Sequence, residues 1–149
     1  MKIVKVKPDN KDAIALMDEL SGELEKITGN SGRHSFNSED VCTPCSVFAV
    51  AYDDNDNPLG CGAIRPYDDE TAEVKRMYAK AKGKSVGTEI LTYLEQQAKA
   101  MGYSRLCLET RVVNERAVAF YKRRGYKVIE NYGKYQGHKE AICFEKELR

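Results

Sequence analysis

Apolar positions near the N-terminus recur at helical spacing. Ala13, Met17, Leu20, Leu24 and Ile27 follow one another at steps of three and four residues, which places them on one face of a helix. The Gly-Asn pair that comes next ends this helix. Before it, the alternating run "KIVKVK" is typical of a short strand. The chain therefore opens with a strand and an amphipathic helix.

Three runs in the middle of the chain have the pattern of strands. They read "SVFAVAY", "GCGAIRP" and "TAEVKRMYAK". The turn-like "DDNDNPLG" between the first two predicts a hairpin. The third run alternates, with Glu73, Lys75 and Met77 expected on one face. This part of the chain predicts an antiparallel meander.

The second half of the chain alternates between helical and strand patterns. Val86, Ile90, Leu91, Leu94 and Ala98 form an apolar helical stripe, and "NERAVAFYKRR" predicts a second helix. Strands are predicted for "SRLCLET", "YKVIENY" and "EAICFEKEL". The order β-α-β-β-β-α-β-α-β-β predicts an α/β (mixed α+β) fold with a mixed sheet. One domain is expected, over residues 1–149.

Composition and charge narrow the classes of function. The chain is 42% hydrophobic and 32% charged, and its net charge is +1, so nothing favours binding to nucleic acid or to an anionic membrane. The first residues contain no long apolar run, so neither a signal peptide nor a membrane span is expected. Five cysteines form an odd set, which is typical of a cytoplasmic chain with reduced thiols.

Cys42 and Cys45 form a C-x-x-C motif. A redox pair and half of a zinc site are the functional interpretations. A zinc site needs two more ligands, and the chain offers only His34 and His138. A redox motif should open a helix, whereas Cys45 leads into a predicted strand. The pattern favours incidental cysteines, and no metal is expected.

The stretch "KGKSVGTEI", residues 82–90, begins the first helix of the second half. Its Gly-Lys-Ser triplet is similar to the end of a P-loop, but that motif requires a glycine where Tyr78 stands. A nucleoside-triphosphate site is therefore not expected. A loop before a helix can instead hold a pyrophosphate on its backbone amides. The residues alone leave open an ordinary turn with solvated lysines.

The same stretch resembles the pyrophosphate motif [QR]-x-x-G-x-[GA] of the GNAT family of N-acetyltransferases. Lys82 stands for Gln or Arg, Ser85 replaces the middle glycine, and Gly87 matches the last position. The segments "AEVKRMYA", "LEQQAKAMGYSRLCLET" and "NERAVAFYKRRGYKVI" follow the order of the family from about residue 48 onward. The resemblance implies an acyl-CoA N-acyltransferase fold with a mostly antiparallel sheet, splayed central strands and acetyl-CoA as co-substrate.

The resemblance also implies roles for single residues. The expected coenzyme contacts are Met77, Tyr78, Ala79, Lys82, Gly83, Lys84, Ser85, Val86, Gly87, Thr88, Asn114 and Tyr121. Asn114 and Tyr121 are seven residues apart, so they lie on nearly the same helix face. Asn114 is expected on the pantetheine, and Tyr121 beside the sulfur, where it would protonate the departing thiolate. Glu73 is expected to take the proton of the attacking amine, unless it only pairs with Lys75 or Arg76. No covalent intermediate is implied, and Cys107 is expected to be a buried thiol.

The sequence says less about the molecule that accepts the acetyl group. Arg65, Arg76 and Arg111 stand near the ends or outer faces of strands, and Arg33 lies in the "NSGRHSF" loop. Because arginine binds carboxylates, a small primary amine that also carries an anion is expected, although surface ion pairs explain these residues equally well. A peptide acetyltransferase and a non-catalytic acyl-CoA-binding module are the alternatives. The alternating run "AICFEKEL" is a candidate edge strand through which a homodimer would form.

Overall fold

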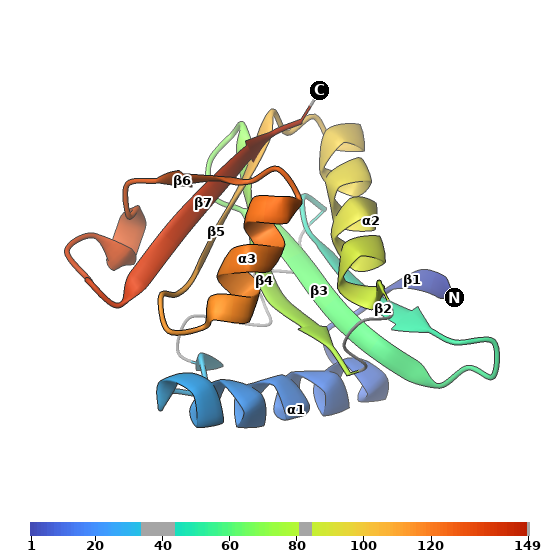
Figure 1. Ribbon diagram of the computed structural model, residues 1–149. Helices are drawn as coiled ribbons and strands as arrows, with labels where there is room; N and C mark the ends of the chain where they lie inside the picture. Colours follow the sequence, from blue (N-terminus) through green and yellow to red (C-terminus); the bar gives the residue numbers. More distant parts are fainter. Residues whose placement is uncertain (34–43, 81–84, 149) are drawn as a thin grey trace.

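The computed structural model describes residues 1–33, 44–80 and 85–148. In these residues one seven-stranded sheet has the order β1-β2-β3-β4-β5-β7-β6 (Figure 1). Neighbouring strands are antiparallel except β4 and β5, which are parallel. The strands are β1 Lys2–Val6, β2 Val47–Tyr52, β3 Pro58–Pro66, β4 Thr71–Ala79, β5 Arg105–Arg111, β6 Lys127–Ile129 and β7 Ala141–Glu147. The predicted mixed, mostly antiparallel sheet is confirmed.

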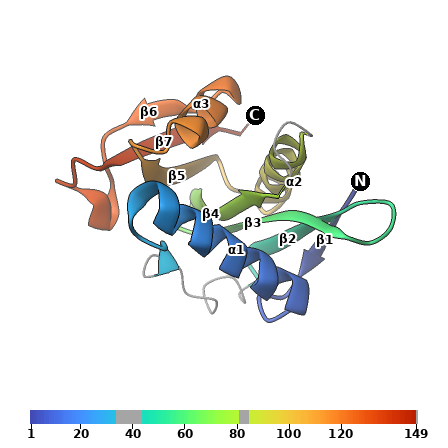
Figure 2. The same cartoon turned by 60° about the horizontal axis from the view of Figure 1, so that its bottom comes forward.

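Helices cover both faces of the sheet. Within the residues that the structure describes, the α-helices are α1 Lys11–Thr28, α2 Val86–Ala100 and α3 Glu115–Arg123. A short 3-10 helix, η3, lies at Gly133–Tyr135. Helix α1 lies on one face, and α2 and α3 lie on the other (Figure 2). In the described part of the chain no helix is long and apolar enough to span a membrane.

Helix α1 is held at both ends by its own sequence. The Asn10 side chain accepts hydrogen bonds from the amides of Asp12 and Ala13, which caps the first turn. Gly29 ends the helix in a left-handed conformation with φ of 79°. The apolar stripe of α1 is buried at Ala13 and Leu20. Near the end of the helix, Ile27 is 45% exposed and lines a surface cleft. One predicted core position therefore belongs to a groove.

A bulge interrupts the alternation of β4. Arg76 has φ of 56°, and the pairing of β3 with β4 shifts register between Cys61 and Ala63. As a result Met77 packs with Val74 in the cluster under α2, whereas Tyr78 packs in the cluster under α1. The prediction that Met77 shares a face with Glu73 and Lys75 was wrong, since the bulge moves Met77 to the opposite face.

The two parallel strands separate after a short ladder. Strands β4 and β5 pair only from Thr71 with Arg105 to Glu73 with Cys107. Beyond this point β4 runs on to Ala79 and β5 to Arg111. Because the strands diverge there, the sheet opens on the side where α3 begins (Figure 1). The predicted splay of the central strands is thus present.

Strand β7 is not an edge strand. It pairs with β5 along its whole length, and its residues 143–145 also pair with β6. The expectation that "AICFEKEL" forms a free edge was wrong, because the segment predicted as the strand "YKVIENY" returns beside it. Only Lys127–Ile129 of that segment is strand. The alternation in β7 instead reflects its two sheet faces.

Candidate active site

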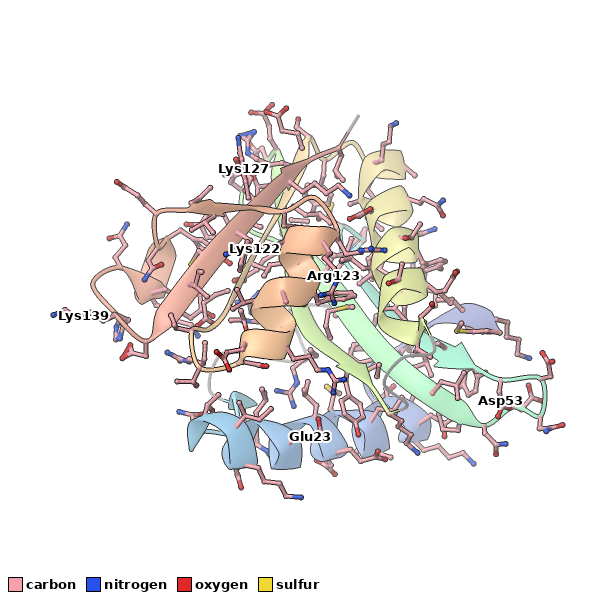
Figure 3. All side chains as sticks on the ribbon, viewed as in Figure 1. Glu23, Asp53, Lys122, Arg123, Lys127 and Lys139 are labelled. Carbon is pink, nitrogen blue, oxygen red and sulfur yellow. The ribbon has the colours of Figure 1, made fainter. Side chains whose placement is uncertain are left out.

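A cleft of about 620 Å³ runs between β4, the start of α2, and helices α1 and α3. Its walls include all of the predicted coenzyme contacts that the structure describes, which are Met77, Tyr78, Ala79, Ser85, Val86, Gly87, Thr88, Asn114 and Tyr121. Lys82, Gly83 and Lys84 lie outside the described residues. Charged side chains stand along the cleft, among them Glu23 of α1 and Arg123 of α3 (Figure 3).

A smaller cavity of about 160 Å³ continues from this cleft into the gap between β4 and β5. The cleft and the cavity share six lining residues, which are Leu20, Leu24, Met77, Asn114, Ala117 and Tyr121. A long molecule in the cleft and a small molecule in the cavity would therefore meet at these residues, among which Met77, Asn114 and Tyr121 are predicted coenzyme contacts. Such a junction suits the transfer of a group between two substrates.

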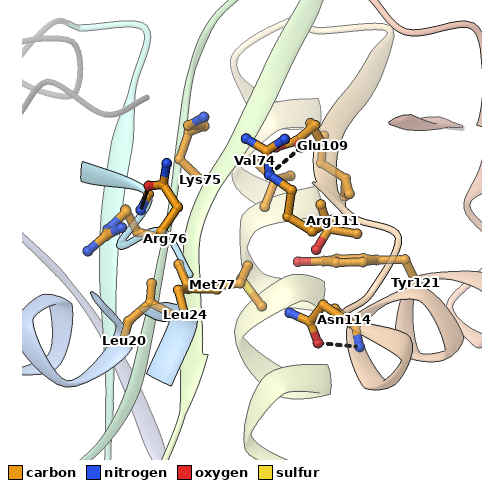
Figure 4. Close-up of a pocket in the computed structure, with 15 residues that line it drawn as sticks. Leu20, Leu24, Val74, Lys75, Arg76, Met77, Glu109, Arg111, Asn114 and Tyr121 are labelled. Atoms are coloured by element: carbon orange, nitrogen blue, oxygen red, sulfur yellow. Dashed lines mark hydrogen bonds and ion pairs between the residues drawn. The ribbon is translucent and has the colours of Figure 1, made fainter. Parts of the chain in front are cut away.

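Helix α3 presents Asn114 and Tyr121 to the junction (Figure 4). Asn114 caps the helix, since its side-chain oxygen accepts a hydrogen bond from the amide of Ala117 at 3.4 Å. The Tyr121 hydroxyl points across the cavity toward β4, and the ring is 7% exposed. Burial raises the pKa of Tyr121 far above its ordinary value, so this hydroxyl keeps its proton at neutral pH.

Glu73 lies away from this junction. It is buried and does not line the cavity. The Arg65 guanidinium contacts one carboxylate oxygen at 2.9 and 3.0 Å, and the Tyr132 hydroxyl donates to the other at 2.6 Å. The Lys75 ammonium is 3.9 Å away. The role of Glu73 as the catalytic base stays a prediction. What the structure shows is a buried ion pair between Arg65 of β3 and Glu73 of β4.

The four predicted acceptor arginines separate in the structure. Arg111 lines the cavity and points into it (Figure 4). Arg76 also lines the cavity, but its guanidinium donates to Ser21 Oγ at 2.6 Å and to the carbonyl of Met17 at 2.9 Å. Arg65 contacts Glu73, and exposed Arg33 lies 3.4 Å from Asp18. Arg111 is therefore the one of the four that is placed to meet a ligand.

Two charged residues of the cavity, Lys75 and Glu109, were not selected from the sequence as site residues. Burial lowers the pKa of Lys75 to about 8. Burial likewise raises the pKa of Glu109, against the opposing effect of Arg111. In the sequence, Lys75 and Glu109 stand out only as charged residues among apolar residues of a predicted strand. Such a pattern is also typical of a strand with one solvated face.

None of the cysteines that the structure describes lines the cleft or the cavity. Cys107 is buried and does not line the cleft or the cavity. Burial raises the pKa of this thiol to about 12, as expected for an inert cysteine. Cys42 lies outside the described residues, and among those described no group of three His, Cys, Asp or Glu side chains is placed to hold a metal.

Replacing Ser85 by Gly is expected to stabilise the chain and to tighten coenzyme binding. Ser85 precedes α2 in a left-handed conformation with φ of 62°, and its side chain makes no capping hydrogen bond. A left-handed conformation costs a residue with a Cβ about 1 kcal/mol, so S85G should raise the free energy of unfolding by a similar amount. Thermal unfolding and calorimetric titration with coenzyme A measure the two effects.

Asp56 provides the matched control for this change. It has the same φ of 62° in the turn between β2 and β3, away from the cleft. D56G should relieve the same backbone strain but leave the affinity for coenzyme A unchanged. Equal binding by wild type and S85G would show that the Ser85 side chain does not hinder the ligand.

Comparisons with known proteins agree with this geometry. The model of the acetyltransferase (GNAT) family matches residues 15–126. An IAA acetyltransferase of Azospirillum brasilense is 30% identical over 98% of this chain and 97% of its own length. A structure from Klebsiella pneumoniae described as an acyl-CoA N-acyltransferase superposes with a TM-score of 0.84 at 25% identity, covering 99% and 97% of the two chains.

An aminoglycoside 6'-N-acetyltransferase complexed with coenzyme A has the same fold. Its TM-score is 0.70 at 19% identity, over 100% of this chain and 98% of that chain. The family match covers most of the chain and includes β4, the start of α2, helix α3 and most of helix α1, which together build the cleft. The chain belongs to the acetyltransferase (GNAT) family and is an acyltransferase enzyme.

Proposed function

We propose that the chain transfers the acetyl group of acetyl-CoA directly to the primary amine of a small molecule that also carries an anion. The observation that carries this proposal is the junction at Met77, Asn114 and Tyr121, where a long cleft meets a small cavity. The cleft has room for an extended thioester, and the cavity of about 160 Å³ favours a small acceptor over a peptide.

In the cleft, the pantetheine would lie between β4 and α3. Asn114 has its side-chain oxygen committed to the helix cap, so its amide nitrogen is the group directed at the ligand (Figure 4). The pyrophosphate would lie at the start of α2, where the first amides and the helix dipole favour an anion. Arg116 and Arg123 line the same cleft and add positive charge. A relative of the same fold has been solved with coenzyme A bound.

At the junction, the thioester carbonyl would lie beside the bulge of β4. Arg76 and Met77 have no paired residue in the β3–β4 ladder, so the backbone there departs from regular strand pairing. We propose that the Met77 amide stabilises the oxyanion of the tetrahedral intermediate. The Tyr121 hydroxyl would then give its proton to the departing thiolate of coenzyme A.

The anion of the acceptor is assigned to Arg111. This guanidinium lies 3.6 Å from Glu109 and 3.6 Å from Glu140, which are ion-pair contacts longer than hydrogen bonds. A carboxylate in the cavity would offer it a shorter, charge-assisted contact. An amino acid or a derivative of one meets this description.

Replacing Arg111 by Ala tests this assignment. Loss of one charge-assisted contact should raise the KM of the acceptor roughly 10- to 100-fold and leave the Kd of acetyl-CoA within about twofold. Thiol release from acetyl-CoA, with proteinogenic amino acids and polyamines as acceptors, measures the first quantity. Calorimetry with acetyl-CoA, coenzyme A and ATP measures the second.

The matched control is Arg105→Ala, at the opposite end of β5, where the guanidinium contacts Glu70 and Glu145. This variant should keep the KM of the wild type. Unchanged acceptor kinetics in R111A would overturn the role of Arg111. ATP binding without acetyl-CoA binding would overturn the coenzyme assignment itself.

A further inference from the structure

Glu109 is an unusual carboxylate for a strand interior. It follows the point where β4 and β5 separate, and it lines the small cavity together with Tyr121. Its side chain is 10% exposed. Among the described residues its Oε2 atom is buried and has no hydrogen-bond partner. The contact that this oxygen makes is an ion pair at 3.6 Å with Arg111 Nε.

A buried carboxylate oxygen without a hydrogen bond is costly unless a partner arrives. The partner must be a donor, because an ionised carboxylate only accepts hydrogen bonds. It must also reach the cavity, which is where Glu109 lies. A protonated amine satisfies both conditions, since an ammonium offers three donors and the opposite charge.

The contrast with Glu73 supports this assignment. Both oxygens of Glu73 are engaged inside the protein, by Arg65 and by Tyr132, and Glu73 does not line the cavity. An amine could reach it only by displacing one of these partners. Glu109 lies on the cavity wall and needs no such rearrangement.

We propose that Glu109 binds the ammonium group of the acceptor and takes one of its protons. This inference rests on the proposed function, because it names the group that receives the amine in that reaction. With Arg111 two residues further on the same strand, the site would hold the amine and the anion of one small molecule side by side.

The charges around Glu109 suit this role. Burial raises its pKa, and Glu73 acts in the same direction, while Arg111, Lys75 and Lys134 oppose the rise. A carboxyl group with a raised pKa is a stronger base than an exposed one, which brings it nearer to the pKa at which proton transfer is efficient. The same burial strengthens its attraction for an ammonium.

The proton balance of the step is complete. The ammonium RNH₃⁺ gives one proton to the Glu109 carboxylate, and the nitrogen lone pair forms a bond to the thioester carbonyl carbon. Collapse of the tetrahedral intermediate breaks the C–S bond. The thiolate takes a proton from Tyr121, and the second amine proton restores Tyr121. Glu109 later releases its proton to solvent, so the products are the amide, coenzyme A and one proton.

Replacing Glu109 by Gln tests the proposal with the amine of the panel that the wild type uses best. We expect kcat/KM to fall about 100-fold, while the Kd of acetyl-CoA measured by calorimetry stays within about twofold of the wild type. In the wild type, kcat/KM should fall at acidic pH as the Glu109 carboxylate becomes protonated. This acid limb should be absent from the pH profile of E109Q. Glu145→Gln on β7, a carboxylate paired with Arg105, should keep the wild-type rate.

Hydroxylamine separates proton transfer from a structural role. Its nitrogen is much less basic than that of an alkylamine, so it needs no base at neutral pH. Acetohydroxamate formation by E109Q, corrected for the reaction without protein, should therefore stay close to that of the wild type. An equal loss with hydroxylamine and with the panel amine would overturn the proposal.

The remaining outcomes are also decisive. An unchanged kcat/KM of E109Q with the panel amine would overturn the role of Glu109 and leave the proposed function intact. If the wild type binds acetyl-CoA but acetylates no member of the panel, the proposed acceptor class is wrong, and the assignment of Glu109 falls with it.

Discussion

Replacing Tyr121 by Phe is expected to lower kcat by about 1,000-fold while the Kd of acetyl-CoA changes less than about twofold. A general acid contributes roughly 100- to 10,000-fold to the rate of such a reaction. The ring of Tyr121 packs against Phe120, Tyr126 and Phe144, and Phe keeps these contacts. The variant therefore removes one hydroxyl from the junction without opening a cavity.

The loss should not depend on pH near neutrality. Burial raises the pKa of Tyr121 so far that the hydroxyl stays protonated throughout the working range. A pH profile of kcat should therefore be displaced downward in Y121F with its shape unchanged. Steady-state thiol release measures the profile, and calorimetry measures the Kd.

Tyr126 gives a matched control for the Tyr121 variant. It is also buried and its ring contacts Tyr121, but its hydroxyl donates to Glu95 at 2.8 Å and does not line the cleft. Y126F should lower the melting temperature slightly and keep kcat within about threefold of the wild type. If kcat falls by the same small factor in Y121F and in Y126F, Tyr121 serves as a packing residue and the thiolate takes its proton from another group.

Local periodicity predicted most of the fold. The apolar stripes of α1 and α2 are strong signals, because each of these helices packs one face on the sheet. The boundaries of β4 were also close to the predicted ones. What the pattern could not show was the bulge at Arg76, since it depends on how β3 pairs with β4 and not on a residue type. This bulge determines the face of the sheet on which the Met77 side chain lies.

The candidate site was predicted unevenly for a related reason. The coenzyme residues come from two continuous segments, so the resemblance could locate them. The partners of Glu73 come from two other segments: Arg65 stands opposite it on β3, and Tyr132 is 59 residues away in sequence. Contacts of this kind follow from the tertiary structure. Glu109 was overlooked because a glutamate in a strand is usually solvated.

Removing the Glu73 carboxylate should cause the largest loss of stability. Glu73 is 3% exposed and Arg65 is mostly buried. Breaking a buried ion pair costs about 3 kcal/mol or more, because the remaining charge keeps its desolvation penalty. Glu73→Ala also takes away the acceptor of the Tyr132 hydroxyl. We expect the melting temperature to fall by about 6–12 °C.

The exposed glutamate of the neighbouring turn provides the comparison for Glu73→Ala. Glu70 lies 3.9 Å from Arg105 and its side chain is 68% exposed, so Glu70→Ala should cost less than about 1 kcal/mol. Adding Arg65→Met to Glu73→Ala should restore part of the lost stability, because it removes the guanidinium that has lost its Glu73 contact. Equal melting temperatures for the two single variants would show that the pair contributes nothing.

Glu73→Gln decides between the two carboxylates of the site. Glutamine keeps an acceptor for Tyr132 but has no charge for Arg65 and cannot take a proton. If Glu109 is the base, the folded fraction of E73Q should show the same acid limb in its pH profile as the wild type. A folded E73Q that lacks this limb would restore Glu73 as the base, as the resemblance implied, and would require its proton to travel through Lys75, which lies 3.9 Å from Glu73 and lines the cavity.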